Sequence, residues 1–196
     1  MLRSDPRLCG FKIPGEVERI LVALFADDTT VYLSENDKYC DLLDVLETWC
    51  KASRARFNKN KTEIIPIGTK EYRDKVRRTR SLNGTEADIP EDVEILKDGQ
   101  ATRLLGAWVG NGIDQAAVWT DTVRKVDKEL RRWHTAKPTL HAKALVVQMT
   151  VGGLTQYKTR VQGMPNSIQE ELNKSIRKFI WGEGRGSPIA MAELQR

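Results

Sequence analysis

One stretch, ILVALFADDTTVYL from Ile20 to Leu33, constrains the fold of this chain more than any other. An unbroken apolar run meets two adjacent carboxylates, Asp27 and Asp28, and a second short apolar run follows them. Short apolar runs that are bounded by turn residues and rich in β-branched and aromatic types are typical of strands buried on both faces. The stretch therefore predicts a β-hairpin in the middle of a sheet, with two negative charges at its tip.

The two carboxylates need a partner, because adjacent negative charges repel each other and resist leaving water. Mg²⁺ is a simple partner, since it prefers oxygen ligands and usually takes one or two carboxylates plus substrate phosphates. Two such ions about 3.5–4 Å apart can clamp the attacking and leaving oxygens of a phosphoryl transfer. The alternative is that Asp27 and Asp28 are only the polar tip of a solvated turn. This alternative stays open because short motifs often match by chance.

The charge distribution favours a polyanionic partner. Net charge is +5, but residues 51–80 carry eleven Lys and Arg against three acids, whereas residues 81–100 carry six acids against Lys97. Clustered Lys and Arg displace counterions from phosphates and mark the footprint of a nucleic acid. A basic solvated face is the other interpretation. We expect residues 81–92 to form an acidic surface loop that keeps away from the nucleic acid.

The bulk composition predicts a folded intracellular protein, either cytoplasmic or nuclear. The hydrophobic fraction of 40% is enough for a core, and the longest apolar run is far too short to span a membrane. The first residues have no apolar segment of the signal-peptide kind. Cys9, Cys40 and Cys50 follow no metal-ligand spacing, so we expect reduced thiols, no disulfide-linked partner and no membrane.

Three further elements are expected before residue 110. Ser34 and Asp37 resemble a capping box, and the apolar periodicity after them predicts a helix of about 20 residues packed behind the hairpin. Residues 62–68 predict a strand, which Pro66 places at a sheet edge. The Asp98-Gly99 turn predicts a second hairpin between residues 93–96 and 104–109.

Beyond Gly110-Asn111-Gly112, the best candidate for a hinge, the pattern becomes entirely helical. Three apolar stripes step by three and four residues and predict three helices that share a core. The stripes are Trp119, Val123, Val126, Leu130 and Trp133; Leu140, Ala144, Val147, Val151 and Leu154; and Ile168, Leu172, Ile176 and Phe179. The outer face of the first helix is basic and consists of Arg124, Lys125, Lys128, Arg131 and Arg132. This face could follow a nucleic-acid backbone, or it could simply be solvated.

Four motifs carry a family resemblance, and they occur in the order that the family has. They are Phe25-Ala26-Asp27-Asp28, then Asn58 to Glu63 (NKNKTE), then Leu104-Leu105-Gly106, and finally Phe179-Ile180-Trp181-Gly182. The set resembles the F/Y-A-D-D, N-x-x-K-T-E, aromatic-Leu-Gly and F-I-W-G stretches of non-LTR (LINE-type) retrotransposon reverse transcriptases. The resemblance spans nearly the whole chain.

The resemblance implies an α+β fold that corresponds to the back half of the polymerase. Residues 1–110 would form a partial palm, an antiparallel sheet backed by a helix, with the catalytic hairpin and the primer-grip hairpin. Residues 111–181 would form an all-α, three-helix thumb, and residues 182–196 a flexible tail.

The resemblance also implies RNA-directed DNA polymerase chemistry, a nucleotidyl transfer that uses an RNA template, a DNA primer, deoxynucleoside triphosphates and two Mg²⁺ ions. Asp27 would be the principal metal ligand and Asp28 the second, and both would be catalytic. Lys61 would approach the leaving pyrophosphate, and the alternative is that Lys61 is only a solvated lysine in a loop. The primer end or incoming nucleotide would contact Phe25, Ala26, Leu105 and Gly106.

Two departures from the family pattern limit this expectation. Leu104 stands where the family often has an aromatic residue. The fingers and the first palm aspartate precede the F/Y-A-D-D motif in the family, and only 26 residues precede Asp27 here. We therefore expect a polymerase fragment that is inactive alone. The alternatives are a non-catalytic basic module that binds RNA or DNA, and an inert α+β domain.

Overall fold

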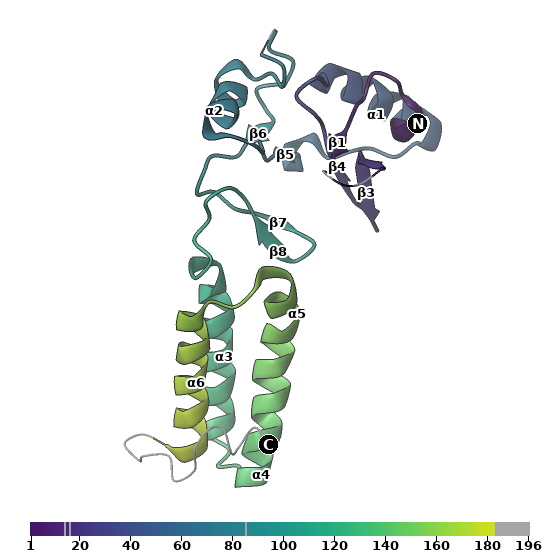
Figure 1. Cartoon of the computed structure of the whole chain (residues 1–196). Helices are drawn as coiled ribbons and strands as arrows, with labels where there is room; N and C mark the ends of the chain where they lie inside the picture. Colours follow the sequence, from purple (N-terminus) through teal and green to yellow (C-terminus); the bar gives the residue numbers. More distant parts are fainter. Residues whose placement is uncertain (14, 16, 85, 183–196) are drawn as a thin grey trace. The chain divides into compact units, whose positions relative to one another are not determined.

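The computed structural model describes residues 1–182, apart from 14, 16 and 85, and the chain forms two compact units. The first unit is Met1–Lys97 and the second begins at Asp98 (Figure 1). Helices and small sheets occur together, so the α+β class is confirmed. The division lies between Lys97 and Asp98, whereas the sequence placed it after residue 110.

The first unit combines short strands with two α-helices. Its elements are η1 (Leu2–Ser4), β1 (Phe11–Lys12), β2 (Arg19–Ile20), β3 (Val22–Phe25), β4 (Asp28–Val31), α1 (Tyr39–Ser53), η2 (Lys59–Lys61), β5 (Glu63–Ile64), α2 (Lys70–Thr79) and β6 (Glu94–Ile95). In the described residues every sheet has two strands, which pair as β1 with β2, β3 with β4, and β5 with β6.

The hairpin of β3 and β4 forms as predicted, but it does not lie in the middle of a sheet. Its register runs from Val22 opposite Val31 to Phe25 opposite Asp28. The prediction of strands buried on both faces was wrong, because the described residues place no third strand beside this pair. Without such a neighbour the outer half of the hairpin is open to solvent, and Leu24 and Phe25 are 71% and 66% exposed.

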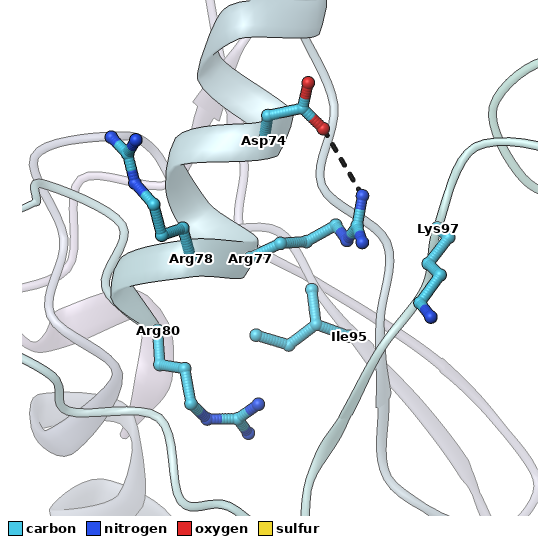
Figure 2. A pocket seen from close by; sticks show the side chains of 6 residues that line it. All are labelled: Asp74, Arg77, Arg78, Arg80, Ile95 and Lys97. Atoms are coloured by element: carbon cyan, nitrogen blue, oxygen red, sulfur yellow. Dashed lines mark hydrogen bonds and ion pairs between the residues drawn. The ribbon is translucent and has the colours of Figure 1, made fainter.

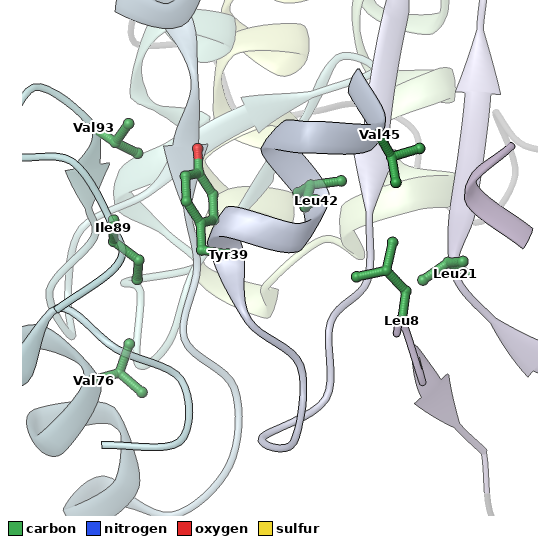
Figure 3. Close-up of a cluster of buried hydrophobic side chains, with 8 residues drawn as sticks. All are labelled: Leu8, Leu21, Tyr39, Leu42, Val45, Val76, Ile89 and Val93. Carbon is green, nitrogen blue, oxygen red and sulfur yellow. The ribbon is translucent and has the colours of Figure 1, made fainter. Parts of the chain in front are cut away.

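The core of the first unit draws side chains from sequence segments that are far apart (Figure 3). Its buried members are Leu8, Leu21, Tyr39, Leu42, Val45, Val76, Ile89 and Val93. Helix α1 contributes one face to this core, as an amphipathic helix should. Helix α2 contributes Val76, which is fully buried.

Helix α1 begins later than the expected capping box. Tyr39 is its first residue, and Lys38 at the N-cap position makes no side-chain capping bond. Asp37 is instead fully buried, and its carboxylate accepts hydrogen bonds from the backbone N–H groups of Cys9 (2.5 Å), Gly10 (2.9 Å) and Ser34 (2.7 Å). Asp37 therefore ties the start of the chain to the loop before α1.

The acidic segment 81–92 is not the free surface loop that its charge indicated. Ile89 is 3% exposed and belongs to the core. Asp88 supplies the missing cap of α1, since its Oδ2 accepts a hydrogen bond from the N–H of Tyr39 at 2.5 Å. A carboxylate at a helix N-terminus satisfies an otherwise unpaired donor and suits the helix dipole. This tertiary role overrides the expectation from local composition.

The second predicted hairpin also differs in the structure. β6 pairs in parallel with β5, through Glu63 opposite Glu94 and Ile64 opposite Ile95, and it has no antiparallel partner across the Asp98-Gly99 turn. The edge strand that we expected over residues 62–68 is present as β5, which is limited to Glu63–Ile64. Leu96 also donates its N–H to the carbonyl of Ile64 at 2.9 Å, which extends the β5–β6 contact by one hydrogen bond.

The second unit has one hairpin followed by helices. Its elements are β7 (Thr102–Leu104), β8 (Ala107–Val109), η3 (Ala117–Trp119), α3 (Thr120–His134), α4 (Leu140–Val147), the π-helical turn η4 (Gln148–Gly152), α5 (Gly153–Gln162) and α6 (Asn166–Trp181). Helices α4 and α5 follow one another through η4, so the described part of this unit has three helical segments, which are α3, the continuous α4–η4–α5 segment and α6 (Figure 1).

The helical core confirms two of the three predicted stripes. Trp119, Val123, Val126 and Leu130 are buried beside Ile168, Leu172 and Phe179 of α6. Burial lowers the pKa of Lys158, whose ammonium lies 5.0 Å from the centre of the Trp119 ring. Trp133 is 39% exposed and stands at the edge of this core.

The second stripe is confirmed only in part, because Val147 and Val151 pack against the helical core but other members do not. Leu140 and Leu154 are 55% and 39% exposed, whereas the buried positions are Val146, Thr150 and Thr155. The last of these steps is five residues, because η4 is a π-helical turn. A π-bulge inserts one residue into an α-helix and rotates everything beyond it, so a periodicity of 3.6 cannot follow the buried face through this point.

The Gly110 segment is closely packed rather than open. A Cβ atom at Gly110 would lie 2.1 Å from the carbonyl oxygen of Gln100. Gly99 also donates its N–H to the carbonyl of Asn111 at 2.7 Å. Glycine is required here for close backbone approach, which accounts for the sequence signal without a hinge.

Other expectations concern the whole chain. Cys9, Cys40 and Cys50 are all free. Among the described residues, no helix combines the length and the apolar character that crossing a bilayer requires. The tail expected over residues 182–196 lies, beyond Gly182, outside the described residues.

Candidate functional site

The two candidate metal ligands stand at the tip of the β3–β4 hairpin. Ala26 and Asp27 are the two central residues of its turn, and Asp28 is the first residue of β4. Ala26 has a φ of 53°, a left-handed conformation that costs about 1 kcal/mol for a residue with a Cβ atom. Glycine is the usual residue at such a position in a tight hairpin, so this turn holds a strained backbone.

Both carboxylates are exposed, and neither forms a hydrogen bond or an ion pair with any residue that the structure describes. Phe25 and Leu24 beside them are also exposed, so the tip presents apolar and acidic groups together. The side chains of Asp27 and Asp28 thus remain available to a ligand.

The metal expectation can be tested against the donors that are present. Two carboxylates match the one or two that a single Mg²⁺ ion commonly takes. However, the described residues contain no group of three or more His, Cys, Asp or Glu side chains that could hold a metal ion. The tip therefore fits part of the coordination of one ion and does not fit a complete two-metal site.

Lys61 ends η2, directly before the loop that leads to β5, and it is exposed. It forms no ion pair with Asp27 or Asp28 in the described part of the chain. The structure thus shows Lys61 on a surface turn of the first unit without bringing it into contact with the acidic tip.

Leu105 and Gly106 belong to the second unit, where they form the turn of the β7–β8 hairpin. Both have positive φ values, 48° and 85° respectively. A Cβ atom at Gly106 would lie 3.1 Å from the ring of Tyr157, and the Tyr157 hydroxyl donates a hydrogen bond to the Leu105 carbonyl. Helix α5 therefore fixes the conformation of this turn.

Gln162 is a positioning residue that the sequence did not indicate. Its Oε1 accepts the backbone N–H of Trp108 at 2.8 Å, and its Nε2 donates to the Trp108 carbonyl at 2.9 Å. The side-chain amide thereby pairs with β8 as a neighbouring strand would. No local pattern marks this role, because the two residues are 54 positions apart.

The basic face expected on α3 is exposed, and helical periodicity places it opposite the buried stripe. Its members are Arg124, Lys125, Lys128, Arg131 and Arg132. Arg124 pairs with Asp121 at 2.9 Å, and Arg132 approaches Glu129 at 3.6 Å. Within the described residues the other three have no ion pair, so they carry most of the available charge.

The last family-like motif has a packing role. Phe179 is 4% exposed in the core of the second unit, and Lys143 donates a hydrogen bond to the Ile180 carbonyl at 2.7 Å. Gly182 follows the end of α6 with a φ of 84°. These contacts tie α4 to the end of α6.

Neither the comparison with protein-family models nor the comparison with curated proteins finds a match for this sequence. The function of this chain is therefore inferred from its motifs and from the geometry of its hairpins and helices.

Proposed function

We propose that this chain is part of a non-LTR retrotransposon reverse transcriptase, that it binds nucleic acid, and that it does not polymerise alone. The observation that carries the proposal is the strained turn at Ala26, which presents two unpartnered carboxylates on an exposed hairpin. Backbone strain persists where the surroundings enforce it and is common at functional sites. The ordered set of four motifs gives the tip its chemical interpretation.

Asp27 and Asp28 would hold one Mg²⁺ ion together with phosphate oxygens of a bound nucleic acid. Such an ion neutralises charge that develops on phosphate oxygens. The carboxylates alone are a weak site, because Mg²⁺ usually keeps several waters and is completed by substrate phosphates. Since the described donors do not complete a two-metal site, we derive no step of nucleotide transfer from them.

The first prediction concerns the acidic tip. We expect Mg²⁺ to tighten binding of an RNA template annealed to a DNA primer by roughly tenfold relative to EDTA, about 1.4 kcal/mol. Asp27→Asn should remove most of this gain without changing the fold, because Asp27 is exposed and unpaired. Fluorescence anisotropy of labelled primer–template measures both quantities.

Glu35→Gln is the matched control, since it removes one exposed negative charge from the same unit. It should leave the Mg²⁺ effect intact. Binding that ignores Mg²⁺ and tolerates Asp27→Asn would favour the alternative of a non-catalytic nucleic-acid-binding module. Primer extension by the purified chain above background would contradict the proposal that it is inactive alone.

The second prediction concerns the basic face of α3. The logarithm of the affinity falls linearly with the logarithm of the salt concentration, and each Lys that contacts a duplex phosphate makes this slope steeper by about 0.9. Lys128→Gln should therefore lower this slope by about 1. Arg160→Gln on α5 is the control, because Arg160 is also exposed but lies on another helix, and it should leave the slope unchanged. Equal slopes for both variants would argue against a backbone contact at α3.

A further inference from the structure

A basic hollow of about 340 Å³ lies within the first unit, between the C-terminal end of α2 and strand β6 (Figure 2). It is lined by Asp74, Arg77, Arg78, Arg80, Ile95 and Lys97. Four cationic side chains against one carboxylate give the lining residues a formal charge of +3. None of these residues belongs to the acidic tip or to the basic face of α3.

The side chains do not all face the hollow. Figure 2 shows Arg77 and Arg80 extending from the helix end toward the segment that carries Ile95 and Lys97. The guanidinium of Arg78 points to the other side of α2. Cations from two separate elements thus converge, with an apolar side chain between them.

Arg80 is held in place without being neutralised. Its Nε donates to the Ile89 carbonyl at 3.0 Å, and its Nη2 donates to the carbonyls of Val93, at 2.7 Å, and Pro90. These acceptors fix the guanidinium but carry no formal charge, so its positive charge persists. Arg77 differs, because Asp74 lies 3.3 Å from its Nη1 and offsets part of its charge.

The helix dipole explains only some of this arrangement. Cations in the last turn of a helix are favoured by the carbonyl end of the dipole, which accounts for Arg77 and Arg78 on α2. It does not account for Lys97, which follows β6 and comes from a different element. Like charges gathered beside an apolar side chain repel each other, and an anion relieves that repulsion.

We propose that this hollow binds a backbone phosphate of a nucleic-acid strand. Nη1 of Arg80 makes none of the three carbonyl bonds and can donate to a phosphate oxygen. The guanidinium of Arg77 presents further donors, and an ammonium adds a point charge. A strand suits the site better than a free phosphate, because α2 continues the positive surface with Lys70 and Arg73. The proposal rests on the nucleic-acid binding proposed above and adds the place in the first unit where a phosphate is held.

The test uses the full chain and a labelled single-stranded RNA in EDTA, so that no metal effect at Asp27 contributes. Lys97→Gln should raise the Kd roughly three- to tenfold, since it removes a phosphate contact. Lys97→Arg should restore most of the affinity. Lys38→Gln is the matched control, because it removes the same charge from an exposed lysine of the same unit that does not line the hollow, and it should change the Kd less than twofold.

Asp74→Asn provides a variant of the opposite sign. It removes the acid of the hollow and releases Arg77, so the Kd should fall. The Asp74 side chain is 55% exposed, so this change leaves the fold intact even if Lys97→Gln does not fold. RNA with uncharged methylphosphonate linkages should bind more weakly and should not respond to Asp74→Asn.

Equal effects of Lys97→Gln and Lys38→Gln would overturn the proposal, because they would indicate a general loss of charge. An unchanged or higher Kd for Asp74→Asn would overturn it as well. Failure of the magnesium or extension experiments would leave these results unaffected, since this measurement contains no metal and requires no polymerisation.

Discussion

Replacing Trp119 by alanine is expected to lower the free energy of unfolding of the second unit by about 3–5 kcal/mol. Trp119 is fully buried among Val123, Val126 and Leu130, and the substitution would leave a large cavity in that core. Small domains are stable by only about 5–15 kcal/mol, so the loss is a substantial share of the total. Urea denaturation followed by far-ultraviolet circular dichroism measures it.

Two further variants test the cause of this loss. Trp133→Ala, near the other end of the same buried stripe, should cost about 1–2 kcal/mol, because Trp133 is 39% exposed and has less apolar surface to lose. Trp119→Phe should destabilise the unit less than the lost side-chain volume suggests. Nε1 of Trp119 is buried without a hydrogen-bond partner in the described part of the chain, so phenylalanine removes an unsatisfied donor. Equal losses for Trp119→Ala and Trp133→Ala would refute the assignment of Trp119 to the centre of the core.

Replacing Asp37 by alanine is expected to destabilise the first unit by at least about 3 kcal/mol. The change leaves the buried N–H of Gly10 and the partly buried N–H groups of Cys9 and Ser34 without their acceptor. A buried unsatisfied donor costs about 1–3 kcal/mol, and a hydrogen bond to a charged group contributes about 1.5–3 kcal/mol. Asp37→Asn should lie between the wild type and Asp37→Ala, because an amide keeps one acceptor oxygen. Urea denaturation of the full chain measures the series.

Asp44→Ala is the control for this series. Asp44 is also an aspartate of this region, but its side chain is 67% exposed and it pairs with Arg7 at 3.2 Å. Exposed ion pairs contribute about 0–1 kcal/mol, so the control should change stability little. A loss at Asp44 that matches the loss at Asp37 would show that charge, rather than the three backbone hydrogen bonds, determines the effect.

The acidic hairpin could be predicted from local pattern because all of its determinants lie within fourteen consecutive residues. Asp27 and Asp28 follow one apolar run and precede another, and antiparallel pairing across so short a turn needs no distant partner. The exposure of Phe25 could not be predicted in this way. It depends on whether a further strand lies beside the hairpin, which is a property of the sheet and not of the run.

The basic hollow illustrates the opposite case. The sequence marked residues 51–80 as basic, but it placed Lys97 in an acidic segment. Only the parallel pairing of β5 with β6 carries the chain back toward the end of α2. A parallel pairing between segments about 30 residues apart leaves no local pattern of its own, so the convergence of Arg77, Arg80 and Lys97 required the folded chain.

By itself, the sequence determined the α+β class, the hairpin with its acidic tip, the buried stripes of α3 and α6, and the basic face of α3. These features depend on residues that are near neighbours along the chain, where a period of two or 3.6 places side chains on one face. The tertiary structure alone decided the burial of Asp37, the capping of α1 by Asp88, the rotation of the second stripe at η4 and the hollow beside α2. In most of these cases the partner is distant in sequence, and hydrogen bonds between distant groups form only once the chain has folded.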